Sequence, residues 1–441
     1  MKMNSDFKKI HKGSILINSL CVFTRLKKDS VLKKYKVLLE YLCQDKLILG
    51  ESISIYNDFA FELLKKSDGT SLKKYIIDEI FLDNNAFTNM IDRDDLNNQY
   101  IINQVKFELK ALEFITNIKS EDIKEAIIYK CKAMDFEEEV VKGLINFEVN
   151  SFEEYDTYKA IDKLKLSILN CDGWGESLDN IIEFYRQYGT GIFGEYRAFV
   201  WENEDGEGYL RGITSPDPVK LEELVGYESQ KETIIENTEQ FLNGYPANNL
   251  LLYGQRGTGK SSTVKAIINE YYTKGLRLIE VDKDKLVDFT KIIRMLKNKK
   301  LKFIIFVDDL AFEDGDESYS ALKTILEGGV ENKSNNILIY ATTNRKHLVK
   351  ETFSERGDEI HQMDSVEEKL SLSDRFGITV SFYSPDQKEY LKIVDGLALS
   401  RNIKVDTEYL HAEALKWVRW YNGKSPRTAK QFINWFEASL K

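Results

Sequence analysis

Proline is scarce in this chain and is missing from its first half. The sequence has five prolines among 441 residues, and all of them follow residue 215. Because proline removes a backbone donor and clashes with the preceding helical turn, its absence permits long helices. Glycine is also absent between Gly69 and Gly143, and apolar residues recur at helical spacing in the ranges 32–42, 77–81 and 102–115. We therefore predict an all-helical N-terminal domain over residues 1–188.

Cysteine and histidine are sparse as well, with four of each. The cysteines lack CxxC spacing and the histidines form no ligand cluster, which excludes a disulfide framework and a structural zinc site and is typical of a cytoplasmic protein. No run approaches the roughly 18 apolar residues that cross a bilayer. Residues 8–23 imitate a signal peptide, but they continue into further basic residues instead of a cleavage site. They are predicted to form an amphipathic helix or strand.

A net positive charge is also lacking, since 62 Lys and Arg face 72 Asp and Glu for a net charge of −10. A basic coat for nucleic acid is therefore excluded. Residues 1–50 are an exception, with a local net charge of +7. This segment suits an unidentified protein or nucleic-acid partner, or it is a solvated helix face that keeps the domain soluble.

Strand patterns begin only after a segment rich in glycine and acidic residues, 189–218, which is predicted to be a linker or a small hairpin. Short apolar runs then alternate with helical stretches, which indicates a parallel sheet covered by helices on both faces. The runs are residues 249–253, 276–281, 303–307 and 337–340. The α/β domain is predicted over residues 219–384, and a small α-helical lid over residues 385–441. Trp417, Trp420 and Trp435 have the spacing of lid core residues rather than of base-stacking aromatics.

A phosphate-binding pattern follows the first apolar run. Residues 254–261 read Gly-Gln-Arg-Gly-Thr-Gly-Lys-Ser and match GxxxxGK[ST] in full. The glycines let backbone N–H groups turn toward phosphate oxygens, and the following helix N-terminus favours negative charge. Lys260 is predicted to reach the β- and γ-phosphates, and the Ser261 hydroxyl to ligate Mg²⁺. The residues predicted to bind the nucleotide here are Gly254, Gly257, Thr258, Gly259, Lys260, Ser261 and Ser262.

A second motif lies about fifty residues further on, where an apolar strand ends in two carboxylates, Asp308 and Asp309. Carboxylates at that end of a strand lie at the sheet edge where ligands bind in open α/β folds. Asp308 is predicted to hold Mg²⁺ through water, and Asp309 to orient or deprotonate the attacking water. The alternative is a pair that merely caps the next helix.

These motifs, with others in the expected order, resemble the AAA+ ATPase superfamily over roughly residues 219–436. More narrowly, the chain is similar to a bacterial AAA+ family called domain of unknown function 815, which has no assigned biological role. The segments that carry this resemblance are VGYESQK, GQRGTGKSS, FVDDLAFE, YATTNRKHL, LSLSDRFG and SPRTAKQF.

The resemblance implies roles for further residues. Val225 and Gly226 would hold adenine, and Asn344 would position the lytic water as sensor 1. Arg375 would be an arginine finger that reaches the ATP of a neighbouring subunit, and Arg427 a sensor 2 residue that reports the γ-phosphate. Arginine suits both posts because it is always charged and its planar fork matches phosphate oxygens. For each arginine the alternative is a surface salt bridge, and Arg345 and Arg356 compete with Arg375 as fingers.

The sequence departs from common AAA+ patterns at two places. The usual Asp-Glu pair is here Asp308-Asp309, so the base is one methylene shorter and its turnover is expected to be slow; Glu313 could substitute for it. The segment 281–290 lacks the aromatic-apolar-glycine loop of protein-threading members. A pore-threading unfoldase is therefore disfavoured.

Three functions are compatible with these features to different degrees. The leading one is a homo-oligomeric ATP hydrolase that uses ATP and Mg²⁺ to remodel an unidentified macromolecular partner. The second is a slow-hydrolysing, ATP-dependent binding switch or assembly platform. A small-molecule kinase with the same phosphate loop is the weakest, because it does not explain Asn344, Arg375 and the lid together.

Overall fold

The computed structural model describes residues 2–67, 71–148, 159–171, 173–312, 317–327, 334–344, 374–420 and 423–440. The chain divides into two compact units, Met1–Glu195 and Tyr196–Lys441. Within the described ranges, no helix is both long and apolar enough to cross a membrane.

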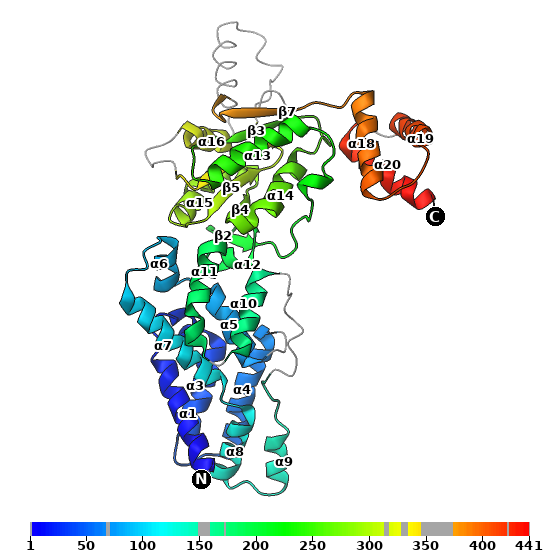
Figure 1. The fold of residues 1–441 in the computed structure, drawn as a ribbon. Helices are drawn as coiled ribbons and strands as arrows, with labels where there is room; N and C mark the ends of the chain where they lie inside the picture. Colours follow the sequence, from blue (N-terminus) through cyan, green and yellow to red (C-terminus); the bar gives the residue numbers. More distant parts are fainter. Residues whose placement is uncertain are drawn as a thin grey trace. The chain divides into compact units, whose positions relative to one another are not determined.

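The N-terminal unit is built from helices, with no strand among its described residues (Figure 1). The prediction of an all-α N-terminal region is therefore confirmed. The long proline-free stretches form its longest helices, as their apolar spacing indicates. Its helices are α1 (Lys2–Asn18), α2 (Thr24–Lys28), α3 (Ser30–Leu42), α4 (Leu49–Ser67), α5 (Leu72–Leu82), α6 (Ala86–Asp92), α7 (Gln99–Thr116), α8 (Ser120–Cys131), α9 (Phe136–Lys142), α10 (Ala160–Asn170), α11 (Leu178–Tyr188) and α12 (Ile192–Glu195).

A buried carboxylate ties the turn between α1 and α2 to α7. Glu108 is fully buried, and its oxygens accept hydrogen bonds from the backbone N–H groups of Cys21, Val22 and Phe23 at 2.8 to 3.1 Å. Gln104 donates to the same carboxylate at 2.7 Å. Because the turn lies outside any helix, Glu108 supplies the acceptors that its backbone would otherwise lack.

Glu108→Ala should therefore lower the free energy of unfolding by on the order of 3 kcal/mol, since three backbone donors, of which that of Phe23 is buried, lose their acceptor. Urea unfolding of the whole chain, followed by circular dichroism, measures this change. Glu125→Ala, at an exposed position on α8, is the matched control and should cost less than about 0.5 kcal/mol. Equal losses in the two variants would contradict a structural role for the Glu108 carboxylate.

The C-terminal unit contains a seven-stranded sheet in the order β2-β1-β4-β5-β6-β3-β7. All neighbouring pairs are parallel except β1 and β2. The predicted α/β fold with a parallel sheet is confirmed. The strands are β1 (Ala198–Glu204), β2 (Glu207–Gly212), β3 (Leu250–Gly254), β4 (Leu276–Glu280), β5 (Lys302–Val307), β6 (Ile337–Thr343) and β7 (Ile378–Phe382). The helices that alternate with these strands along the chain are α13 (Glu228–Leu242), α14 (Lys260–Tyr271), α15 (Phe289–Leu296) and α16 (Glu317–Glu327).

Both faces of this sheet are buried, as the continuous apolar runs predict. One face packs on α13 and α14 through residues that alternate along each strand, such as Leu250 and Leu252. The residues between them, such as Leu251 and Ile305, are buried as well.

A hairpin forms within the segment expected to be a linker or a small hairpin. Strands β1 and β2 pair with each other, and β1 also pairs in parallel with β4, so the hairpin extends the main sheet. Trp201 on β1 is buried and donates from Nε1 to Asp288 at 3.2 Å. Gly208 faces this indole, and a Cβ there would lie 2.0 Å from the Trp201 ring. Glycine at this position is therefore needed to seat the tryptophan.

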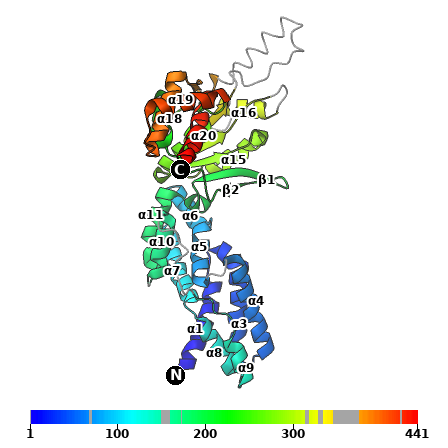
Figure 2. The ribbon, with the colours of Figure 1, turned by 90° about the vertical axis from the view of Figure 1, so that its right-hand side faces the viewer.

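The predicted helical lid is present as α18 (Gln387–Ser400), α19 (Thr407–Trp420) and α20 (Pro426–Ser439), which lie together in Figure 2. Trp417 packs on the lid core, and its ring centre lies 5.2 Å from that of Trp435. The expectation that all three lid tryptophans are core residues is wrong for Trp420, which is 75% exposed, and for Trp435, which is 46% exposed. Trp420 is the last residue of α19, and neither Trp420 nor Trp435 belongs to the apolar cluster of the lid.

Candidate functional site

The loop between β3 and α14 carries the phosphate-binding pattern, and three of its glycines have backbone angles that L side chains rarely adopt. The φ angles are 152° at Gly254, 81° at Gly257 and 98° at Gly259. A Cβ at Gly254 would lie 1.9 Å from the Phe382 carbonyl oxygen on the neighbouring strand β7. Helix α14 begins directly after the loop, at Lys260, so its free N–H groups face the loop.

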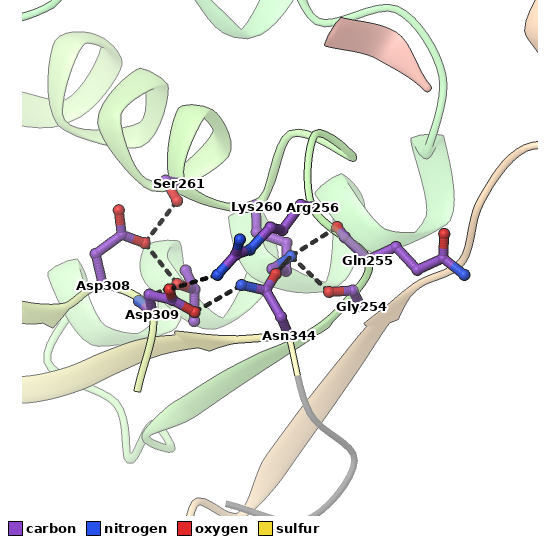
Figure 3. Close-up of polar contacts among 9 residues, drawn as sticks. Gly254, Gln255, Arg256, Lys260, Ser261, Asp308, Asp309 and Asn344 are labelled. Carbon is purple, nitrogen blue, oxygen red and sulfur yellow. Dashed lines mark hydrogen bonds and ion pairs between the residues drawn. The ribbon is translucent and has the colours of Figure 1, made fainter. Parts of the chain in front are cut away.

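Lys260 is buried, and its ammonium group is held by oxygen atoms. It donates to the carbonyl oxygens of Gly254 at 2.7 Å and Gln255 at 2.9 Å, and to Asn344 Oδ1 at 2.9 Å (Figure 3). Burial lowers the pKa of Lys260. The positive charges of Arg427 and Arg256 also lower this pKa, whereas Asp308 and Asp309 raise it. Lys260, Arg256 and Arg427 line one pocket beside Asp308 and Asp309, and their positive charges suit a polyanionic ligand.

Ser261 and Asp308 lie side by side, as a Mg²⁺ site requires. Ser261 Oγ donates to Asp308 Oδ1 at 2.6 Å. Thr342, on β6, donates to the same oxygen at 2.5 Å and accepts from the Asp309 N–H at 2.9 Å. Mg²⁺ in nucleotide sites uses one or two protein oxygens plus phosphates and water. The oxygen donors of Ser261 and Asp308 fit that ion.

Asp309 stands at the mouth of the site in a strained conformation, with φ at 51°. Aspartate and asparagine tolerate this left-handed region better than most side chains do. The backbone angle thus gives a physical reason for an aspartate at this position. Its Oδ1 accepts from Asn344 Nδ2 at 2.6 Å, and its Oδ2 lies 3.6 Å from an Arg256 nitrogen. Asn344 therefore bridges Lys260 and Asp309 (Figure 3).

These groups line a pocket of about 920 Å³, to which both the α/β core and the lid contribute residues. Val225 packs on the lid core, and a Cβ at Gly396 of α18 would lie 2.6 Å from its side chain. Arg427 closes the other side, since its backbone N–H donates to the Gly257 carbonyl at 3.2 Å. The predicted site residues that line this pocket are Val225, Gly226, Gly257, Thr258, Gly259, Lys260, Ser261, Ser262, Asp308, Asp309, Asn344 and Arg427. Gly254 contributes its carbonyl oxygen to Lys260.

Arg375 is the predicted site residue that lies elsewhere. It lines a different pocket of about 560 Å³, together with Asn249, Asn335 and Ile337, which stand at the amino ends of strands or just before them. The phosphate loop lies at the carboxyl end of β3, and β7 runs parallel to β3. The other candidates named from the sequence, Glu313, Arg345 and Arg356, lie outside the described residues.

Sequence reasoning missed two residues of this site. Thr342 positions both Asp308 and Asp309, although it stands only two residues before Asn344. Arg256 occupies a variable position of the phosphate-binding pattern, so the pattern assigns it no role. Its proximity to Asp309 depends on how β3 and β5 are placed in the sheet.

Residues 194–440, more than half of the chain, match the family described as "Protein of unknown function (DUF815)". The chain belongs to this family. With the parallel sheet, the phosphate loop and the lid, this DUF815 chain is a member of the AAA+ class of P-loop proteins.

Other similarities cover shorter parts of the chain. Replication factor C large subunit from Staphylothermus marinus is 39% identical over 66 residues, which are 15% of this chain and 15% of that protein. Vacuolar protein sorting-associated protein 4 from Dictyostelium discoideum is 32% identical over 154 residues, 30% of this chain and 35% of that protein. The Thermotoga maritima RuvB Holliday junction branch migration motor matches with 19% identity and a TM-score of 0.33, over 48% of this chain and 62% of its own. This chain therefore spans only a minor part of the first two relatives.

Proposed function

We propose that this DUF815 protein binds and hydrolyses ATP with Mg²⁺, and that it works as a cytoplasmic homo-oligomer that remodels a macromolecular partner. The observation that carries the proposal is the convergence of Lys260, the Ser261–Asp308 pair and the Asp309–Asn344 pair in one pocket under the lid. Each group has a separate task in phosphoryl transfer to water, and their hydrogen bonds link them into one network.

ATP binding is divided between the two ends of the pocket. The adenine would lie against Val225 and Gly226, next to Ile393 and Leu397 of the lid helix α18. The phosphates would lie on the loop, where the helix N-terminus and Lys260 supply positive charge. Because the lid contributes to the pocket, occupancy by ATP would favour lid closure over the core.

Hydrolysis is assigned to the mouth of the pocket. Mg²⁺, held by Ser261 and Asp308, would neutralise charge on the phosphates. Asp309 would orient the attacking water and accept its proton, and Asn344 would fix the carboxylate through the bond to its Oδ1. Arg427 lines the same pocket from the lid and would sense the γ-phosphate there.

The oligomer is inferred from the position of Arg375. The five-residue strand β7 alone, at about 3.3 Å per residue, spans about 13 Å between its amino end, near Arg375, and its carboxyl end beside the phosphate loop. Arg375 is thus directed to a different edge of the sheet from the nucleotide of its own chain. A finger at this place can act only on the nucleotide of a neighbouring subunit.

The partner is assigned to the N-terminal unit. A protein or nucleic acid remains the candidate, through the basic residues 1–50. Several of these lysines are engaged within the unit: Lys34 pairs with Glu62 at 3.0 Å, and Lys9 with Asp122 at 3.6 Å. This pairing weighs toward a protein partner, since fewer free charges are left for phosphates.

A slow-hydrolysing switch is the second candidate function. It is favoured by the short Asp309 side chain and by its two existing contacts, with Asn344 and Arg256. In such a switch, bound ATP would hold the lid closed and keep a partner surface formed.

Steady-state ATP hydrolysis per subunit, measured over a wide range of protein concentration, tests the proposal. A specific rate that rises and then reaches a plateau is expected, because a neighbour completes each site. A substantial rate that does not depend on concentration would contradict the oligomer. Tight ATP binding with almost no hydrolysis at any concentration would favour the switch, and absence of ATP binding would overturn both functions.

A further inference from the structure

Arg256 makes an ion pair that the phosphate-binding pattern does not require. Its side chain is 78% exposed, yet one guanidinium nitrogen lies 3.6 Å from Asp309 Oδ2. The other oxygen of Asp309 accepts from Asn344, and Asn344 accepts from Lys260. Figure 3 shows these four side chains joined by the contacts just described. Arg256 is thus linked through two side chains to the lysine predicted to hold the terminal phosphates.

We propose that Arg256 is a positioning residue that exchanges partners: it pairs with Asp309 when no nucleotide is bound and turns to the terminal phosphate when ATP is bound. The inference rests on the proposed ATPase function, because Asp309 matters only if water attacks a phosphate at this site. Through this exchange, occupancy by a triphosphate would free the carboxylate that orients the water.

The backbone around Arg256 favours such an exchange. The loop backbone is held on both sides of Arg256, because the Gln255 carbonyl accepts from Thr258 Oγ1 at 2.8 Å and the Gly257 carbonyl accepts from the Arg427 N–H at 3.2 Å. The Arg256 side chain, in contrast, is mostly exposed. The exchange therefore needs only a rotation of the long Arg256 side chain, from Asp309 toward the terminal phosphate.

Charge decides the direction of the exchange. An exposed ion pair with a single carboxylate contributes little, typically less than about 1 kcal/mol. A triphosphate oxygen carries more negative charge, and the guanidinium fork fits phosphate oxygens in the same two-pronged way as carboxylate oxygens. The Arg256 charge already acts on Lys260, since it contributes to the lowered pKa of that ammonium. A phosphate bound to Lys260 would therefore attract Arg256 away from Asp309.

ADP leaves the position of the γ-phosphate empty, so Arg256 would return to Asp309 after product release. Arg256 would then distinguish ATP from ADP, and it would do so within one subunit. This role differs from the one proposed for Arg375, which lines a different pocket and is assigned to the nucleotide of a neighbouring subunit.

The first test compares the affinities of the full-length protein for ATP and ADP, using fluorescent analogues in the presence of Mg²⁺. Arg256→Gln should weaken ATP binding by about tenfold, as expected for the loss of one charge-assisted contact, and leave ADP binding within about twofold. Arg256→Lys should restore part of the preference, since the charge returns without the fork. Arg211→Gln is the matched control: Arg211 is also exposed and also pairs with a carboxylate, Glu202 at 2.7 Å, on the hairpin away from the pocket.

The second test is a double-mutant cycle for ATP affinity. Asp309→Asn should tighten ATP binding several-fold more in the wild-type background than in the Arg256→Gln background, because only wild-type Arg256 is released from a competing partner. An equal effect of Asp309→Asn in both backgrounds would overturn the exchange. So would an ATP-to-ADP preference that Arg256→Gln leaves unchanged while the wild type binds both nucleotides. If the wild type binds neither nucleotide, the ATPase proposal itself fails.

Discussion

Asp309→Asn is expected to lower kcat for ATP hydrolysis by about 10²- to 10⁴-fold, the usual contribution of a positioned general base. The substitution keeps the shape of the side chain, and its oxygen can still accept from Asn344 Nδ2. Asparagine is also well tolerated at the φ of 51° that this position adopts. Only the negative charge and the basicity are lost, so ATP affinity should rise, because Arg256 no longer pairs with a carboxylate at this position.

Single-turnover hydrolysis with excess enzyme, together with equilibrium ATP binding, measures this prediction. Lys260→Ala is the complementary control, because it removes the ammonium group and should abolish ATP binding instead of the chemical step. A thermal melt of each variant shows that the fold is retained. Hydrolysis at the wild-type rate in Asp309→Asn would show that another carboxylate is the base, and Glu313 would then be the first to replace.

Asp309→Glu tests the length of the base separately. If the short side chain limits the rate, the added methylene should bring the carboxylate closer to the water and raise kcat. The left-handed backbone conformation opposes this gain, since glutamate adopts that φ at a higher cost in stability than aspartate does. A lower melting temperature with a higher kcat would separate the two effects. An unchanged kcat would remove the argument for a slow base.

Local patterns in the sequence were sufficient to predict the parallel sheet and the phosphate-binding pocket. Strands β3 to β6 are mostly apolar because both of their faces are buried, and such runs are visible without knowledge of their neighbours. The phosphate loop is equally local, since its glycines, its lysine and the start of α14 are contiguous in the chain. The lid helices have the apolar spacing of one buried face.

Features that depend on contacts between distant segments could not be predicted from local sequence patterns. The pairing of β1 with β4 joins residues about eighty positions apart, and neither the glycines nor the acidic residues of the hairpin specify it. Strand β7 has a mixed burial pattern and follows a turn, so its sequence showed no clear apolar run or alternation that would predict a strand. The contacts of Asp309 with Arg256 and Asn344 arise where three strands end at one edge, which only the strand order determines. The exposure of Trp420 likewise depends on packing at the end of α19.

Arg375→Ala is expected to lower the rate of ATP hydrolysis by about 10³-fold or more, the range seen when an arginine finger is removed. ATP binding should stay within a few-fold of the wild type, because Arg375 is absent from the pocket that Lys260 lines. Steady-state hydrolysis at a concentration on the plateau, with ATP affinity and a thermal melt of each variant, provides the measurement. Arg211→Ala, on the hairpin, is the control for loss of an arginine charge and should keep the wild-type rate.

Mixing two inactive variants distinguishes a finger that acts on a neighbour from one that acts on its own site. Arg375→Ala subunits keep an intact nucleotide pocket, and Lys260→Ala subunits keep an intact finger. In a head-to-tail assembly with random mixing, about one quarter of the subunits would combine their own pocket with a neighbour's finger, so about a quarter of the wild-type specific rate should return. If the mixture stays as inactive as its components although the variants assemble together, Arg375 does not act across subunits. If Arg375→Ala alone leaves the hydrolysis rate unchanged, Arg375 is not the arginine finger. Arg345 and Arg356 would then be the next candidates to replace.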